Sequence, residues 1–177
     1  MSTALLALAR VLDYPTDLAA DARAASAALA SLPVAAERLL RLADRAERDP
    51  ASLEEAYVSA FELAPLASPF VGDQLFGASQ ARHLFLARVG AMQRAAGLDP
   101  APELPDHLSA VLRLVALAPP SRARSSRSGD GALPAARQML QALEAANHPY
   151  ADALAAIAEV LEATTNHAAP AAEEALP

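Results

Sequence analysis

The chain contains no cysteine. This absence excludes structural disulfides, thiolate metal sites and a cysteine nucleophile, and it agrees with a cytoplasmic protein. Aromatic residues are also scarce, at 4% of 177 residues, and there are only 6 glycines. Strands favour β-branched and aromatic residues, whereas alanine is the strongest helix former. The alanine-rich composition therefore predicts an all-α protein.

Basic clusters and long apolar runs are lacking as well. The net charge is −7, from 14 basic and 21 acidic residues. We expect no nucleic-acid binding, because neutralising phosphates requires clustered Arg and Lys. Residues 1–15 have no basic leader and too short an apolar run for a signal peptide. No run approaches the ~20 apolar residues that span a bilayer. We therefore expect a cytoplasmic protein without a membrane span.

Apolar residues recur at helical spacing between proline breaks. This pattern predicts about eight helices and no strand. Thr16 is expected to cap the second helix, and Ser52 and Glu55 form an S-x-x-E capping box for the fourth. The charges of the third helix are expected to form a solvated face. The approximate helical ranges are 2–13, 16–32, 34–48, 52–64, 78–96, 105–118, 134–146 and 150–163.

The order of these segments predicts a single-domain helical bundle over residues 1–165. Residues 119–134, PPSRARSSRSGDGALP, lack apolar periodicity, so we expect a mobile loop there. This loop is either a functional lid or hinge, or an inert insertion. Residues 166–177 are expected to be a disordered tail. Because a long hinge allows elements to be exchanged between copies, the expected state is a monomer or a weak, domain-swapped dimer.

The common catalytic motifs are missing from the sequence. There is no Gly-rich phosphate loop, HExxH, GxSxG or EF-hand loop. The best metal candidate is the group Glu103, Asp106 and His107, three potential ligands within five residues. The same residues fit a helix start, where acidic side chains complement the helix dipole, and we prefer this interpretation. We therefore expect no enzymatic activity, no bound cofactor and no metal.

Aromatic and acidic residues come together in YVSAFEL, residues 57–63. Tyr57 and Phe61 are i, i+4 neighbours on one helix face, a spacing typical of a core as well as of a binding face. Glu62 lies beside them, and the acidic residues Asp73, Glu103 and Asp106 from later in the chain would join it in the folded protein. Together these side chains would form a groove complementary to a basic peptide. The alternative is that they serve only packing, capping and solvation.

Three stretches carry a resemblance to a known family. They are YVSAFEL at 57–63, LFGASQAR at 75–82 and AGLDPAPELPDHL at 96–108, the last followed by an apolar helix. This pattern resembles the NarJ-like branch of the TorD/DmsD superfamily of redox enzyme maturation proteins, the assembly chaperones of molybdenum enzymes. LDYP at 12–15 and NHPYADALAAIAEVLE at 147–162 are similar too. The likeness covers most of the chain, and ELPDHL is its most specific part.

The chain departs from the family pattern at two places. Ala78 stands where the family commonly has the Glu of GES, and residues 79–83 read SQARH where nitrate reductase chaperones often have SRDRG. The run SPFVGDQLFG, residues 68–77, resembles the chaperones of dimethyl sulfide, ethylbenzene, chlorate or selenate oxidoreductases more closely. These departures concern the client enzyme rather than the family.

The resemblance implies a non-enzymatic, cytoplasmic chaperone. It would bind the apo catalytic subunit of a molybdenum oxidoreductase, often through an N-terminal peptide with a twin-arginine signal, and support insertion of the molybdenum cofactor. The alternative is a helical interaction or structural subunit without a molybdoenzyme client. The expected client-binding residues are Tyr57, Phe61, Glu62, Asp73, Phe76, Arg82, Glu103, Asp106 and His107. All except Phe61 and Asp73 are predicted to border one concave surface.

Overall fold

The computed structural model describes residues 1–98, 103–117 and 127–166. These residues form nine α-helices and no strand, which confirms the predicted all-α class. One isolated bridge pairs Phe70 with His107. Residues 119–126 of the predicted loop and residues 167–177 of the predicted tail lie outside the described residues.

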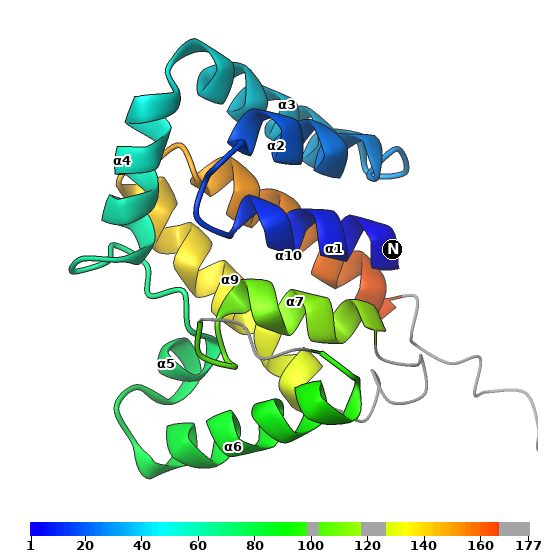
Figure 1. Cartoon of the computed structure of the whole chain (residues 1–177), viewed down its shortest axis with the longest axis vertical. Helices are drawn as coiled ribbons and strands as arrows, with labels where there is room; N and C mark the ends of the chain where they lie inside the picture. Colours follow the sequence, from blue (N-terminus) through cyan, green and yellow to red (C-terminus); the bar gives the residue numbers. More distant parts are fainter. Residues whose placement is uncertain (99–102, 118–126, 167–177) are drawn as a thin grey trace, which may run out of the picture.

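The first three helices build one side of the bundle (Figure 1). They are α1 (Ser2–Val11), α2 (Leu18–Ala27) and α3 (Pro33–Arg48). The predicted cap of α2 is wrong by one residue, because the side chain of Asp17, not Thr16, accepts a hydrogen bond from the Ala20 N–H. This helix also ends earlier than predicted, since residues 28–31 form turns.

Helices α4 (Pro50–Phe61), α5 (Val71–Phe76) and α6 (Gln80–Ala95) follow. The capping box predicted at Ser52 is wrong. Pro50 starts α4 two residues earlier, because its fixed φ suits the first helical turn. The Ser52 N–H then donates to Asp49 Oδ1 at 3.1 Å. The segment predicted as a loop at 65–77 contains α5.

The last helices are α7 (Leu108–Leu117), α9 (Arg127–Ala145) and α10 (Ala151–Asn166). Because α9 starts at Arg127, the loop predicted to end at Pro134 ends earlier, and Pro134 lies inside the helix. α10 runs through the middle of the bundle, beside α1, α3 and α9 (Figure 1). Fully buried leucines of these helices, such as Leu8, Leu39 and Leu154, form the core.

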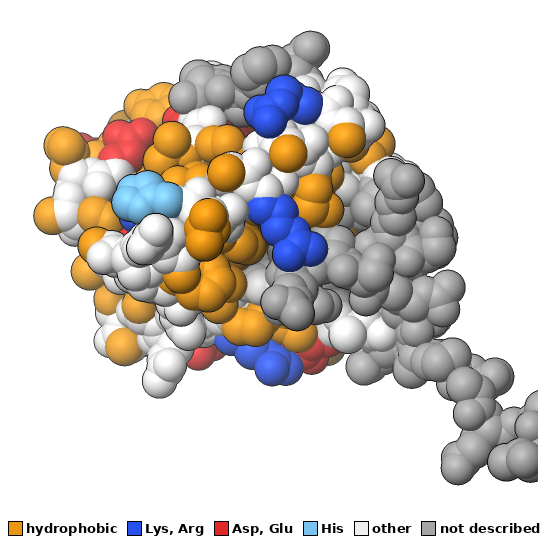
Figure 2. All heavy atoms as spheres, turned by 90° about the horizontal axis from the view of Figure 1, so that it is seen from below, with side chains coloured by type: hydrophobic (Ala, Val, Ile, Leu, Met, Phe, Trp, Pro, Cys, Tyr) orange, Lys and Arg blue, Asp and Glu red, His pale blue; other side chains and the backbone are white. Residues whose placement is uncertain are grey.

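Helix α6 lies at the lower edge of the bundle (Figure 1) and buries only a narrow strip. Of its 16 residues, only Phe85, Val89 and Gly90 are buried. Figure 2, seen from below, shows that apolar side chains are interspersed with basic ones and a histidine on this side of the molecule. Helix α6 therefore exposes much more of its surface than α10 does.

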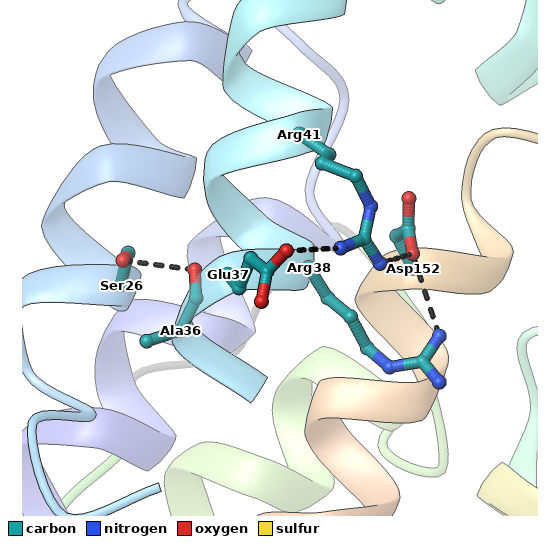
Figure 3. Close-up of polar contacts among 6 residues, drawn as sticks. All are labelled: Ser26, Ala36, Glu37, Arg38, Arg41 and Asp152. Atoms are coloured by element: carbon teal, nitrogen blue, oxygen red, sulfur yellow. Dashed lines mark hydrogen bonds and ion pairs between the residues drawn. The ribbon is translucent and has the colours of Figure 1, made fainter. Parts of the chain in front are cut away.

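Ion pairs connect the helices at the opposite edge. Arg41 Nη2 lies 2.8 Å and Arg38 Nη1 3.4 Å from Asp152 Oδ1 of α10, and Arg41 also contacts Glu37 (Figure 3). Arg45 of the same helix is exposed and makes no ion pair with a described residue. The charges of α3 were predicted to be a solvated face, but two of its arginines reach across to α10.

Candidate functional site

A cavity of about 850 Å³ opens between α4, α6, α7 and the turn after α1. Its walls are Asp13 and Tyr14, Tyr57, the C-terminal half of α6, parts of the segment 103–107 and the first turns of α7. The volume lies in the range of ligand-binding pockets, about 300–1,000 Å³. Three of the residues predicted for client binding, Tyr57, Glu103 and His107, line this cavity.

A chain of polar groups fixes His107 at the cavity wall. Arg113 pairs with Asp13, and its Nη1 donates to Ser109 Oγ at 3.1 Å. Ser109 Oγ lies 2.9 Å from His107 Nδ1, to which the Ser109 N–H also donates at 3.3 Å. Because Nδ1 accepts a backbone hydrogen bond, the ring proton belongs on Nε2. The sequence thus places a fixed N–H donor beside the cavity.

Burial keeps this imidazole neutral. His107 is 3% exposed. Burial lowers the pKa of His107 to about 4; the nearby Asp13 opposes this effect and Arg113 adds to it. At neutral pH the ring therefore carries no charge and acts as a hydrogen-bond donor and acceptor.

An aromatic cluster forms another part of the cavity wall. The ring of Tyr57 meets those of Tyr14, Phe61 and Tyr150 edge-on, at centroid distances of 5.4, 5.3 and 5.9 Å. The Tyr57 hydroxyl donates to the carbonyl of Leu12 at 3.3 Å. Tyr14 is 51% exposed, whereas Phe61 is buried in the core behind the cavity. Burial raises the pKa of Tyr57, so its phenol stays protonated.

Asp106 forms a second, buried cluster. It is fully buried, and its Oδ2 accepts a hydrogen bond from the Gly72 N–H at 3.2 Å and lies 3.7 Å from Arg82 Nε. Its carbonyl accepts from the Val71 N–H at 2.8 Å. Arg82 Nη1 also contacts Asp73 Oδ1 at 3.0 Å. The cluster ties α5, α6 and the segment before α7 together.

The close approach of Asp106 explains the glycine at position 72. A Cβ at Gly72 would lie 2.7 Å from Asp106 Oδ2 and 3.0 Å from Phe85 Cδ1, which is too close without a shift of either group. The guanidinium of Arg82 lies 5.6 Å from the centroid of the Phe70 ring, where a cation–π contact is favourable. Residues from three separate sequence stretches thus form one structural unit.

The structure divides the predicted binding residues into groups rather than one concave surface. Asp73, Arg82 and Asp106 belong to the buried cluster. Glu62 is exposed after α4 and does not line the cavity, and Phe76 packs on Phe85 while its outer side remains exposed. The client-binding role of these nine residues stays a prediction.

The region of the predicted binding residues is less acidic than the sequence suggests. Asp13 is neutralised by Arg113, and Asp73 by Arg82. Burial raises the pKa of Asp106 above its ordinary value, against the opposing effect of Arg82. Among the described acidic residues predicted for this site, only Glu62 and Glu103 are exposed without an ion pair.

The metal alternative lacks a suitable arrangement of ligands. In the part of the chain that the structure describes, no three His, Asp or Glu side chains are grouped closely enough to hold a metal ion. Asp106 and His107 are neighbours in sequence, but they contact Gly72 and Ser109 respectively.

None of the described helices has the length and apolar character needed to cross a membrane.

Sequence reasoning missed most residues of the cavity, among them Tyr14, Ser109 and Arg113. Ser109 and Arg113 are the only polar side chains in LSAVLRLVAL, the sequence of α7. Polar residues four positions apart in an otherwise apolar helix lie on one face, which was the available signal. Tyr14 belongs to the LDYP stretch, which forms part of the family resemblance but was not predicted to bind the client.

The comparison with protein families defines the class of this helical protein. The model of the nitrate reductase delta subunit family matches residues 16–156, from the turn after α1 into α10. The chain therefore belongs to this family, the NarJ-type chaperones of the TorD superfamily, and the resemblance is confirmed. The family consists of assembly chaperones of molybdoenzymes rather than enzymes. A comparison with curated proteins found no match.

Proposed function

We propose that this protein is a cytoplasmic, system-specific chaperone for the apo catalytic subunit of one molybdenum oxidoreductase. It binds the N-terminal segment of that subunit, including a twin-arginine signal peptide where the client is exported. It supports insertion of the molybdenum cofactor into the client before assembly or export. Family membership supports the general role, and the observation that supports peptide binding is the cavity lined by Tyr57, Glu103 and His107.

The cavity offers two kinds of contact for a peptide. Tyr14, Leu98 and Pro105 provide apolar and aromatic surface for side-chain anchors. The His107 Nε2–H is a donor for a backbone carbonyl, and the exposed Glu103 attracts an arginine of the client. Apolar anchors supply most of the affinity in such a complex, whereas charge selects the partner and speeds the encounter.

Co-purification with a defined client tests this function. The tagged protein is co-expressed with the catalytic subunit of a dimethyl sulfide, ethylbenzene, chlorate or selenate oxidoreductase, with and without its N-terminal peptide. We expect the apo subunit to co-purify only when its N-terminal peptide is present. The substitutions Tyr14→Ala and Glu103→Arg should each reduce the amount of subunit that co-purifies. Arg45→Glu, a substitution of an exposed arginine on α3, is the matched control.

A different result would favour the alternative. If no catalytic subunit co-purifies and the molybdoenzymes of the host mature normally without this protein, the chain is a helical interaction or structural subunit instead. Retention of the subunit by Tyr14→Ala and Glu103→Arg at wild-type levels would leave the chaperone role intact but remove the cavity as its binding site. Sedimentation of the free protein would then report whether it is a monomer or a weak dimer.

A further inference from the structure

The outer face of α6 differs from a solvated helix surface. Opposite the buried strip of Phe85 and Val89, α6 carries Leu84, which is 68% exposed, and the exposed residues Ala87, Ala91 and Ala95. Helix α3 has the same length, but its exposed face is mainly charged. An uncharged stripe on an exposed helix face indicates a surface that is covered in some state of the protein.

Cations lie on both sides of this stripe. At about 100° per residue, Leu84, Ala91 and Ala95 fall within about 40° of one another around the helix. On the same scale Arg88 lies about 40° to one side of Leu84, and Arg94 about 80° to the other. Neither arginine forms an ion pair with another described residue, and no acidic residue occurs between positions 80 and 98. Figure 2 shows this mixture of apolar and basic side chains from the α6 side.

We propose that the outer face of α6 docks an acidic amphipathic helix of a partner protein. The alanines permit close approach of a second helix, at an interaxial distance of about 8 Å, and Leu84 inserts between its side chains. Carboxylates that flank the apolar stripe of the partner pair with Arg88 and Arg94. Arg94 also lines the cavity, but Leu84 and Arg88, on which the test below depends, do not, so the test separates this inference from the proposed cavity function.

The charges decide against two other occupants. A second copy of the chain would place the same arginines near one another across an α6–α6 contact, which is repulsive. An anionic membrane would satisfy the arginines, but a stripe of alanines with one leucine offers little apolar area for insertion. A helix with carboxylates beside small apolar residues satisfies both features of α6.

The test uses the full chain and two labelled synthetic helical peptides. One peptide carries a leucine and alanine stripe flanked by glutamates, and the other has lysines in place of the glutamates. Fluorescence anisotropy should show saturable binding of the glutamate peptide only. Leu84→Glu and Arg88→Glu should each raise its Kd about tenfold or more, because they remove an anchor and reverse a contact charge. Arg45→Glu is the control, since Arg45 is also exposed and without an ion pair.

Several outcomes would overturn the proposal. One is that the glutamate peptide shows no saturable binding. Another is that the lysine peptide binds as tightly as the glutamate peptide, and a third is that Arg45→Glu weakens binding as much as the α6 substitutions do. A dimer of the free protein that Leu84→Glu dissociates would assign the face to a second copy. Binding to phosphatidylglycerol vesicles without binding to the glutamate peptide would assign it to a membrane. Because Leu84 and Arg88 are both exposed, circular dichroism should show the variants folded.

Discussion

His107 shows how one buried side chain links the stability of this protein to pH. Its pKa is about 4 in the folded protein against 6.5 for an ordinary histidine. Well above pH 6.5 the ring is neutral in both states and contributes no pH dependence. Below that value the unfolded chain binds a proton that the folded protein does not, so stability falls as the pH falls towards 4. Asp106 has the opposite effect on stability. Because its pKa is raised in the folded protein, the folded state binds a proton more readily than the unfolded chain, and this contribution stabilises the protein as the pH falls.

We therefore predict that the free energy of unfolding loses up to about 3 kcal/mol between pH 7 and pH 4 through His107 alone. A His107→Gln variant lacks this titration, so its stability should decline less steeply over the same range. Urea unfolding of both proteins at several pH values in this range provides the measurement. Parallel curves for the two proteins would show that His107 does not titrate in this way.

Gly72 is the second residue with a sharp consequence. Gly72→Ala should destabilise the protein by about 1–3 kcal/mol, because the new methyl group would collide with Asp106 and Phe85. Gly90→Ala is the matched control, because a Cβ there would meet its nearest neighbours at 3.5 Å, an ordinary contact. That substitution should be neutral or stabilise α6 by up to about 1 kcal/mol. Equal thermal stabilities of the two variants would contradict the steric argument.

At the scale of elements, the contact between α3 and α10 depends on one carboxylate. The side chain of Asp152 is largely buried and forms ion pairs with both Arg38 and Arg41. Removing it leaves two arginines facing each other at the helix interface. Exposed pairs such as Arg137–Glu162 link helices too, but water screens them.

Asp152→Ala should accordingly lower the free energy of unfolding by about 1–2 kcal/mol, more than a typical surface pair contributes. Glu162→Ala, which breaks an exposed pair on the same helix, should change it little. Urea unfolding at low and high salt measures both variants, and the loss in Asp152→Ala should shrink at high salt. Equal effects of the two substitutions would show that burial of Asp152 adds nothing.

The helices were predictable from sequence where apolar periodicity and proline breaks agree. The errors have local physical reasons. Pro50 belongs to the first turn of α4, and α5 is too short for a periodic signal. Pro134 marks no helix start, because α9 begins before it.

The candidate site was predictable only in part. The motif residues were identified, but spacing does not show which way consecutive side chains point. Asp106 and His107 lie where one extended bridge pairs with Phe70, so they face opposite sides. One therefore enters the buried cluster and the other lines the cavity. The partners of the acidic residues, Arg82 and Arg113, come from distant positions and could not be assigned from sequence.

For the whole molecule, burial predicts an uneven distribution of stability. Helix α10 is buried among α1, α3 and α9, whereas α6 buries three of its residues and depends on the Arg82 contacts with Asp73 and Asp106. Segments with few buried contacts open at lower free energy than the core.

Amide hydrogen exchange followed by mass spectrometry should therefore show faster exchange in α6 than in α10. Arg82→Ala should speed exchange in α6 further and leave α10 unchanged, because it releases α6 without unfolding the bundle. Arg88→Ala, on the outer face of the same helix, is the control and should not change exchange. Equal protection of α6 and α10 would mean that the molecule opens only as one unit.

The aromatic cluster at the cavity also determines how this protein emits light. The chain has three tyrosines and no tryptophan. All three tyrosines, Tyr14, Tyr57 and Tyr150, belong to the one cluster that reaches the cavity mouth. The tyrosine fluorescence of the unlabelled protein therefore arises from this place alone. A peptide without tryptophan or tyrosine that enters the cavity will change this emission, so its binding can be followed without a dye.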